Sequence, residues 1–119
     1  MKGSYCLVIE LKEEVEIKVG ALGLFLFPKG IYFYVGRAMG PGGIEARISR
    51  HRRKGWRRPR WHIDYLLERS EVVGEILFPG NGDECKIARD MLEMAGGMVV
   101  APGFGSSDCR CPTHLIYFG

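Results

Sequence analysis

The chain has 119 residues, of which 46% are hydrophobic and 26% are charged, and its formal net charge is +3. This length suits one compact domain over residues 1–119 and excludes two sizeable ones, while the composition is that of an ordinary globular protein. No segment approaches the roughly 18 consecutive apolar residues of a membrane span, and the first residues do not have the pattern of a signal peptide. We therefore expect a cytoplasmic protein without a membrane partner.

The first third of the sequence is typical of β-strands. Extended segments are predicted at residues 4–11, 14–19, 24–27 and 31–35. The first two are expected to form a hairpin through Lys12 and Glu13. Breaker residues at 40–43 (Gly-Pro-Gly-Gly) then end the extended region and predict a helix start.

The helix predicted over residues 43–54 is amphipathic. Ile44 and Ile48 mark its buried stripe, and at about 100° per residue His51 projects close to Ile44. Arg47 flanks the same stripe. We therefore expect Arg47 and His51 at the rim of the core rather than in open solvent.

Positive charge is concentrated at the end of this helix and just after it. Residues 47–60 contain eight of the seventeen Lys and Arg residues, and no acid lies between Glu45 and Asp64. The rest of the chain carries nine bases against fourteen acids, a net charge of −5. Such a patch attracts polyanions, nucleic acid above all, and tryptophan can add stacking. The residues expected to bind nucleic acid are Arg50, Arg52, Arg53, Lys54, Trp56, Arg57, Arg58 and Arg60.

The second half predicts helices mixed with short strands. We expect helices at 61–68 and 83–95, a strand at 72–78, a turn at 79–82, and short strands near 98–101 and 114–118. Strands first and helices later indicate an α+β fold. Glu84 shares the apolar face of the last helix with Ala88 and Met91, where a carboxylate needs a cation, a metal or hydrogen bonds. Alternatively, it sits in a first turn capped by Asp83 or Asn81.

Four cysteines in a chain without a secretion signal favour thiols or metal ligands over disulfides. Cys109, Cys111 and His114 are candidate Zn²⁺ ligands, with Cys85, Cys6 or His62 as the fourth. The alternatives are a disulfide between Cys85 and Cys109, or four small buried residues. The absence of Gln and the single Asn fit a thermophile, a class in which intracellular disulfides do occur.

Together these residues resemble the GIY-YIG nuclease superfamily. That family has two strand motifs that each end in a functional tyrosine, then an arginine on the following helix and a metal-binding glutamate on a later helix. Gly3-Ser4-Tyr5 resembles the first motif and Tyr34-Val35-Gly36 the second. Gly30-Ile31-Tyr32 is rejected as the first motif, because Tyr32 and Tyr34 would share one strand. The long interval between Tyr5 and Tyr34 is expected to hold an inserted hairpin.

Nearly the whole chain is also similar to an uncharacterised archaeal and bacterial subfamily of GIY-YIG-like domains, sometimes fused to endonuclease III. The shared strings are Trp61-His62-Ile63-Asp64-Tyr65, Glu84-Cys85, and Gly103-Phe104-Gly105-Ser106-Ser107-Asp108-Cys109 with Cys111 and His114. The resemblance implies a small, mainly antiparallel sheet flanked by about three helices.

The resemblance also implies a catalytic set. Glu84 would bind Mg²⁺ or Mn²⁺, Tyr5 would act as general base or orient the attacking water, and Arg47 would bind the scissile phosphate. His51 would hydrogen-bond the water or phosphate, and Tyr34 would complete the network. Taken alone, each of these residues is more typical of a core or a surface position.

The implied function is a divalent-metal-dependent endonuclease, a monomer or weak homodimer acting on DNA rather than RNA in repair or processing. Two features depart from the superfamily pattern, because no Asn follows Asn81 and the interval between the tyrosines is long. The alternatives are a non-catalytic nucleic-acid-binding module of the same fold and an RNA-processing enzyme.

Overall fold

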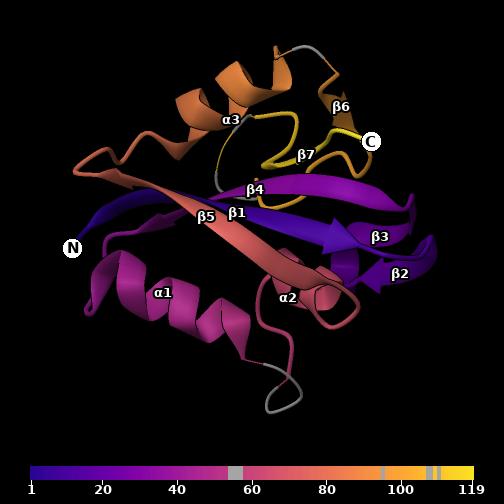
Figure 1. Ribbon diagram of the computed structural model, residues 1–119, viewed down its shortest axis with the longest axis horizontal. Helices are drawn as coiled ribbons and strands as arrows, with labels where there is room; N and C mark the ends of the chain where they lie inside the picture. Colours follow the sequence, from indigo (N-terminus) through magenta and orange to yellow (C-terminus); the bar gives the residue numbers. More distant parts are fainter. Residues whose placement is uncertain (54–57, 95, 107–108, 110) are drawn as a thin grey trace.

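The structure is a computed structural model that describes residues 1–53, 58–94, 96–106, 109 and 111–119. Strands and helices follow one another in the order β1 (Gly3–Leu11), β2 (Val15–Val19), the short 3₁₀ helix η1 (Gly20–Leu22), β3 (Gly23–Phe27), β4 (Gly30–Ala38), α1 (Gly43–Arg52), α2 (His62–Leu67), β5 (Glu71–Pro79), α3 (Glu84–Leu92), β6 (Met98–Val99) and β7 (Leu115–Tyr117) (Figure 1). In this part of the chain, no helix has the length and apolar character needed to cross a membrane.

The main sheet has five strands in the order β5-β1-β4-β7-β6, and every neighbouring pair is antiparallel. With the three α-helices this confirms the predicted α+β class. Strand β1 lies between β4 and β5, and both its faces are largely buried. The strand that carries Tyr5 is therefore an interior strand of the sheet, with a fixed register against β4.

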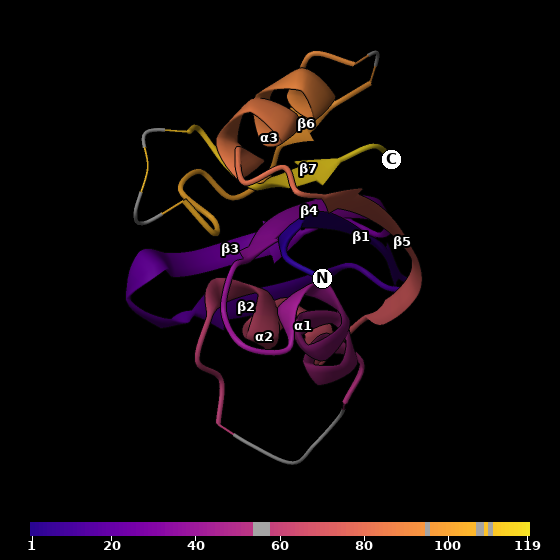
Figure 2. The same ribbon diagram turned by 90° about the vertical axis from the view of Figure 1, so that its left-hand side faces the viewer.

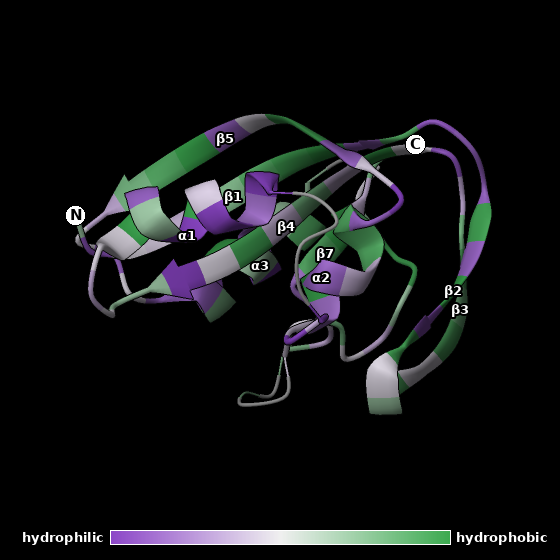
Figure 3. Ribbon diagram, turned by 90° about the horizontal axis from the view of Figure 1, so that it is seen from below, coloured by the Kyte–Doolittle hydropathy of each residue, from purple (hydrophilic) through white to green (hydrophobic). Residues whose placement is uncertain are grey.

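The helices cover the two faces of the sheet unequally. Helices α1 and α2 lie on one face and α3 on the other (Figures 1 and 2). Alternation along the strands separates the core into two clusters. Tyr5, Leu7 and Ile44 belong to the larger cluster on the α1 side, whereas Val35 and Met91 belong to the smaller cluster under α3. Figure 3, seen from the α1 side, shows hydrophobic residues along much of β1 behind this helix.

The expected hairpin between residues 4–11 and 14–19 is wrong. Strand β2 pairs with β3, in a separate two-stranded ribbon, and β1 pairs with β4 and β5. The reason is burial: β1 needs a neighbour on each edge and cover on each face, which one short polar turn to β2 does not supply. The β2–β3 ribbon occupies the long interval between Tyr5 and Tyr34, where the inserted hairpin was predicted.

This ribbon is anchored in the core by one side. Phe27 is completely buried and its ring contacts the rings of Tyr32 and Phe104, whereas the neighbouring Leu26 faces solvent. Ile17 and Val19 of β2 are buried on the same side. The inserted ribbon therefore contributes to the core under α2.

We predict that Phe27→Ala destabilises the protein by about 3–5 kcal/mol, because it removes a fully buried ring and leaves a cavity. The matched control Leu26→Ala, on the next residue, should change the free energy of unfolding by less than about 0.5 kcal/mol. Guanidinium denaturation measures both. Equal effects of the two substitutions would show that the ribbon does not pack as described.

Candidate active site

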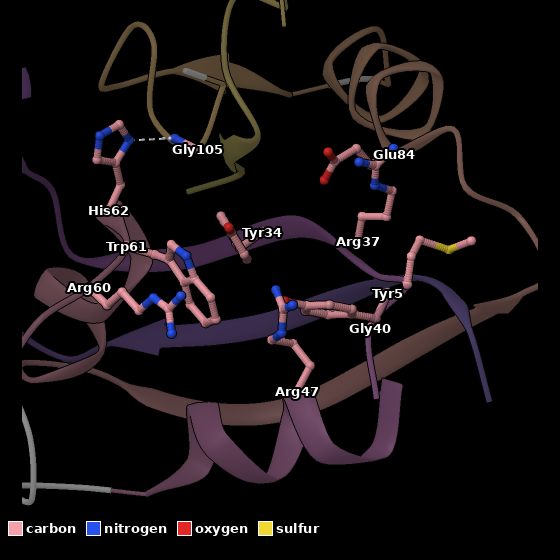
Figure 4. Close-up of a pocket in the computed structure, with 11 residues that line it drawn as sticks. Tyr5, Tyr34, Arg37, Gly40, Arg47, Arg60, Trp61, His62, Glu84 and Gly105 are labelled. Atoms are coloured by element: carbon pink, nitrogen blue, oxygen red, sulfur yellow. Dashed lines mark hydrogen bonds between the residues drawn. The ribbon is translucent and has the colours of Figure 1, made fainter. Parts of the chain in front are cut away.

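A pocket of about 390 Å³ opens where the sheet is incomplete. Strand β7 pairs only with residues 32–34 of β4, so beyond that point β4 has no strand neighbour on the β7 side among the described residues. Residues from both faces of the sheet reach this opening. Tyr5, Tyr34 and Arg47 come from the α1 side, and Arg37 and Glu84 come from the α3 side (Figure 4).

Four of the five predicted catalytic residues line this pocket, namely Tyr5, Tyr34, Arg47 and Glu84. The fifth, His51, lies behind them. It is buried, and its Nε2 is 2.8 Å from the hydroxyl oxygen of Tyr5. The structure thus brings together residues from β1, β4, α1 and α3 that are far apart in the sequence.

Helix α1 places its two residues as its periodicity predicts. Ile44 is fully buried and His51, two turns later, is buried on the same face. Arg47 is half-buried at the edge of that face. At the start of the helix, the amide of Ile44 donates to the carbonyl of Met1 at 2.7 Å. This bond ties α1 to the residues that precede the first residue of β1.

The glycine of Tyr34-Val35-Gly36 has a steric role. In the β1–β4 register, Gly36 is directly opposite Tyr5. A Cβ atom on Gly36 would lie 2.4 Å from Cζ and Oη of Tyr5, a distance that real atoms do not tolerate. The ring of Tyr5 therefore lies across the backbone of β4 only because residue 36 has no side chain.

Burial controls the protonation of Tyr5, Tyr34 and His51. It raises the pKa of Tyr5, against the opposing positive charge of Arg47, and it raises the pKa of Tyr34 well above its usual value. Burial, aided by the neighbouring Arg50 and Arg47 and opposed by Asp64, lowers the pKa of His51 to about 4. At neutral pH both tyrosines are phenols and His51 is a neutral imidazole, so the Tyr5–His51 hydrogen bond joins two uncharged groups.

Arg47, Arg60 and Trp61 form one wall of the pocket, and Arg50 lies behind it against the Trp61 ring. The guanidinium carbons of Arg47, Arg50 and Arg60 lie 4.4, 4.0 and 5.3 Å from the centre of the Trp61 ring, within the range of cation–π attraction. Trp61 is in turn held by Asp64, which accepts hydrogen bonds from the amides of Arg60 and Trp61 at 2.8 and 2.9 Å.

Arg50, expected from the sequence to bind nucleic acid, pairs with an acid. We expected it to face nucleic acid, but its guanidinium makes a bidentate pair with Asp64 at 2.8 and 2.9 Å and its side chain is only 12% exposed. Burial raises the pKa of Asp64, but the bonds from Arg50 and from the two backbone amides outweigh this and lower it. Arg50 therefore holds α1 against α2.

Glu84 combines both roles considered from the sequence. It is the first residue of α3, whose N-cap Asp83 accepts a hydrogen bond from the amide of Lys86 at 3.1 Å. The same carboxylate lines the pocket, where it is the one acidic residue among the described lining side chains. Its Oε2 is 3.7 Å from Nδ1 of His114.

Sequence reasoning missed Arg37 and His62 as pocket residues. Arg37 follows Gly36 on β4 and so points to the α3 side, near Glu84 (Figure 4). Nδ1 of His62 accepts a hydrogen bond from the amide of Gly105 at 2.8 Å, and burial lowers its pKa. His62 is therefore neutral with its proton on Nε2. Strand alternation puts Arg37 on the face opposite Tyr34, so only the end of the sheet beside β4 brings both into one pocket, and no local signal marks His62.

The rest of the basic segment is only partly described. Arg52, Arg53, Arg58 and Arg60 are exposed, and Arg52 contacts Glu75 of β5 in an ion pair. Lys54, Trp56 and Arg57, also expected to bind nucleic acid, lie outside the described residues. Among the described residues, the pocket carries Arg37, Arg47 and Arg60 against Glu84, so its lining is net positive.

The cysteine and histidine candidates form a second group beside the pocket. The ligand atoms of Cys85, Cys109, Cys111 and His114 all lie within 4.8 Å of one another, an arrangement that could hold a metal such as zinc. Burial, together with the neighbouring thiols, raises the pKa of Cys85. Cys6 is buried elsewhere, against Met91, and all four cysteines are free thiols.

Comparisons with known proteins identify the family of this chain. A family model described as "Domain of unknown function DUF123" matches residues 4–119. The chain therefore belongs to this family. A search of curated proteins and a search of solved structures each found no match.

The buried His51 predicts an acid-sensitive step in stability. Between pH 6.5 and about 4 the unfolded chain binds a proton at this imidazole and the folded chain does not, so stability falls as the pH decreases through this window. The loss amounts to at most about 3 kcal/mol and is complete near pH 4. His51→Gln should remove this component. The free energy of unfolding of both proteins is measured by denaturation at each pH from 7 to 4. If it fell equally with pH in the two proteins, a buried neutral His51 would be contradicted.

Proposed function

We propose that this DUF123 protein is a divalent-metal-dependent endonuclease that hydrolyses phosphodiester bonds, with DNA as the favoured substrate. The observation that carries the proposal is the shared pocket, in which two tyrosines, three arginines and one carboxylate converge from β1, β4, α1, α3 and the connection between α1 and α2. Converging groups of opposite charge beside perturbed tyrosines are typical of a reaction site rather than of core packing.

The resemblance to the GIY-YIG superfamily supports the same function. Its pattern requires two tyrosines from neighbouring strands, and here Tyr5 and Tyr34 come from the paired strands β1 and β4. Tyr32, which the sequence analysis rejected as the tyrosine of the first motif, does not line the pocket and packs on Phe27 and Tyr117 instead. An arginine from the next helix and a glutamate from α3 complete the pattern in the expected order.

The residues present fit a hard divalent cation. Mg²⁺ binds proteins through one or two carboxylates and keeps most of its waters, and Glu84 offers one half-exposed carboxylate at the pocket wall. A cation there would neutralise charge on the phosphate and on the leaving oxygen. The arginines fit the same substrate, because Arg47 presents a planar fork that can bind two phosphate oxygens.

Tyr5 and His51 would handle the proton of the attacking water. As water oxygen bonds to phosphorus and the bond to the leaving sugar oxygen breaks, the water proton passes to the oxygen of Tyr5. The phenol proton passes at the same time to Nε2 of His51, 2.8 Å away, and the leaving oxygen takes a proton from solvent. Burial disfavours the imidazolium as well, so His51 releases its proton to solvent as the product leaves. In this relay Tyr5 never becomes a free phenolate, which its burial disfavours.

Nucleic acid would be held outside the pocket by the exposed arginines. Arg58 and Arg60 lie in the connection between α1 and α2, where Arg60 also lines the pocket beside Trp61, and Arg53 follows the last turn of α1. The similarity to domains fused to endonuclease III favours DNA repair or processing. A non-catalytic module that binds through the same arginines is the second candidate, because it needs the charge and not the pocket.

We predict that Glu84→Gln reduces metal-dependent cleavage of plasmid and branched DNA by at least about 100-fold, because it removes the carboxylate charge at the pocket. DNA binding should change little. The matched control Glu93→Gln, exposed at the other end of α3, should cleave like the wild type.

The outcomes separate the candidates. Equal cleavage by wild type and Glu84→Gln would place the activity outside this pocket. Binding without cleavage by the wild type, in Mg²⁺ and in Mn²⁺, would support the binding module instead. Preference for structured RNA over DNA in the same assay would identify an RNA-processing enzyme.

Arginine substitutions test the binding surface. Arg53→Ser combined with Arg58→Ser should lower the slope of log affinity against log salt by about 1–2, because each lost phosphate contact contributes about 0.9. Lys12→Ser with Lys29→Ser removes the same charge from exposed positions outside the basic segment and should leave the slope unchanged. An identical reduction by both pairs would show that only net charge matters, not this surface.

A further inference from the structure

We propose that Cys85, Cys109, Cys111 and His114 bind one Zn²⁺ in a closed, tetrahedral structural site. The four ligand atoms lie within 4.8 Å of one another, although they come from separate parts of the chain. Cys85 is the second residue of α3, Cys109 and Cys111 belong to the connection between β6 and β7, and His114 immediately precedes β7. Convergence of three sulfurs and one imidazole nitrogen is the donor set of structural zinc.

Two of the distances match the edges of a zinc tetrahedron. Nε2 of His114 is 3.6 Å from Sγ of Cys85 and 3.4 Å from Sγ of Cys109. With Zn–S bonds of about 2.3 Å and Zn–N bonds of about 2.0 Å, the edges of a tetrahedron are roughly 3.5–3.8 Å long. The widest separation, 4.8 Å, therefore has to shorten by about 1 Å when the metal binds.

The backbone already holds the histidine in place. The amide of His114 donates to the carbonyl of Phe104 at 2.8 Å, and its carbonyl accepts from the amide of Val35 on β4 at 2.9 Å. His114 and Cys111 are buried, whereas Cys85 and Cys109 are half-exposed, so a cation can reach the cluster from solvent.

A metal at this point would add a crosslink to a segment whose order rests on backbone hydrogen bonds and on Ala101 and Phe104 in the core. Among the described residues, 100–114 contain neither helix nor strand, yet they line the pocket at Gly105. Long irregular connections of this kind need a constraint. Zinc would join this connection to the first turn of α3, on the side of the segment away from the core contacts of Phe104 with Phe27 and Tyr34.

The chemistry of the site is structural rather than catalytic. Four protein ligands fill a tetrahedral zinc and leave no position for water. Binding exchanges three S–H bonds for three Zn–S bonds, and the three protons pass to solvent. Soft thiolates select zinc over Mg²⁺ or Mn²⁺, so this site and the carboxylate of Glu84 would not compete for the same ion.

Through His114, the cluster also lies next to Glu84 of the proposed active site. The inference drawn from this contact rests on the proposed function. When Nε2 of His114 binds zinc, the ring proton lies on Nδ1, which is 3.7 Å from Oε2 of Glu84. Histidine ligands commonly donate this proton to a carboxylate. If the carboxylate moved about 0.7 Å closer, to hydrogen-bond distance, zinc-bound His114 would orient Glu84.

The test measures metal in the full chain. Protein purified under reducing conditions from zinc-supplemented cells should contain about one zinc per chain, and a chelator should lower its melting temperature. Protein refolded with Co²⁺ alone should show thiolate-to-cobalt charge-transfer bands and the visible bands of tetrahedral cobalt. Less than about a tenth of an equivalent of zinc with no cobalt bands would overturn the proposal.

Variants locate the site. Cys109→Ser and Cys111→Ser should each lose most of the zinc, whereas Cys6→Ala, which removes a thiol elsewhere, should keep it. Cobalt bands that persist in both serine variants would overturn the assignment, as would a Cys85–Cys109 disulfide in the native protein under reducing purification. Glu84→Gln should keep its zinc whether or not it cleaves DNA, so failure of the nuclease proposal and failure of the zinc proposal are distinguishable.

Discussion

The contact between the ring of Tyr5 and the backbone of Gly36 is the constraint on which the site depends. It requires one register between β1 and β4, with Tyr5 opposite residue 36, and it requires that this residue have no Cβ. A one-residue slip would turn Tyr5 toward α3 and away from His51. The same register places Tyr34 opposite Leu7, so both tyrosines face α1. The geometry of the pocket is thus a consequence of strand pairing in the core.

The early end of β7 converts this core into a pocket. A sheet that continued beside Gly36 would separate the groups under α1 from those under α3. Because β7 pairs only with residues 32–34, Arg47 and Glu84, from helices on opposite faces, line one opening. The connection that precedes β7 contributes Cys109, Cys111 and His114 to the cysteine cluster, and α3 contributes Cys85. The pocket and the cluster are therefore two results of the same short strand.

The sequence predicted the elements better than their pairing. Each predicted segment overlaps an observed one, because alternation and helical periodicity reflect the burial of one face, which the core clusters confirm. The prediction of a hairpin between residues 4–11 and 14–19 was wrong. It relied on a short polar turn, which is a local signal, whereas the partners of β1 are β4 and β5, which are distant in sequence. For the same reason, it was the family resemblance, and not the spacing of the residues, that predicted that Tyr5, Arg47 and Glu84 lie together.

Charge density in the sequence does not distinguish a binding arginine from a structural one. Arg50 and Arg58 belong to the same basic run, yet Arg50 is held by Asp64 and stacked on Trp61, while Arg58 is exposed. This part-buried pair occupies both terminal nitrogens of the guanidinium, so a phosphate would have to displace Asp64 to bind Arg50. What it does instead is support Trp61, over which Arg47 also lies. The positive character of the pocket wall therefore depends on an acid, Asp64, which fixes the platform that the arginines share.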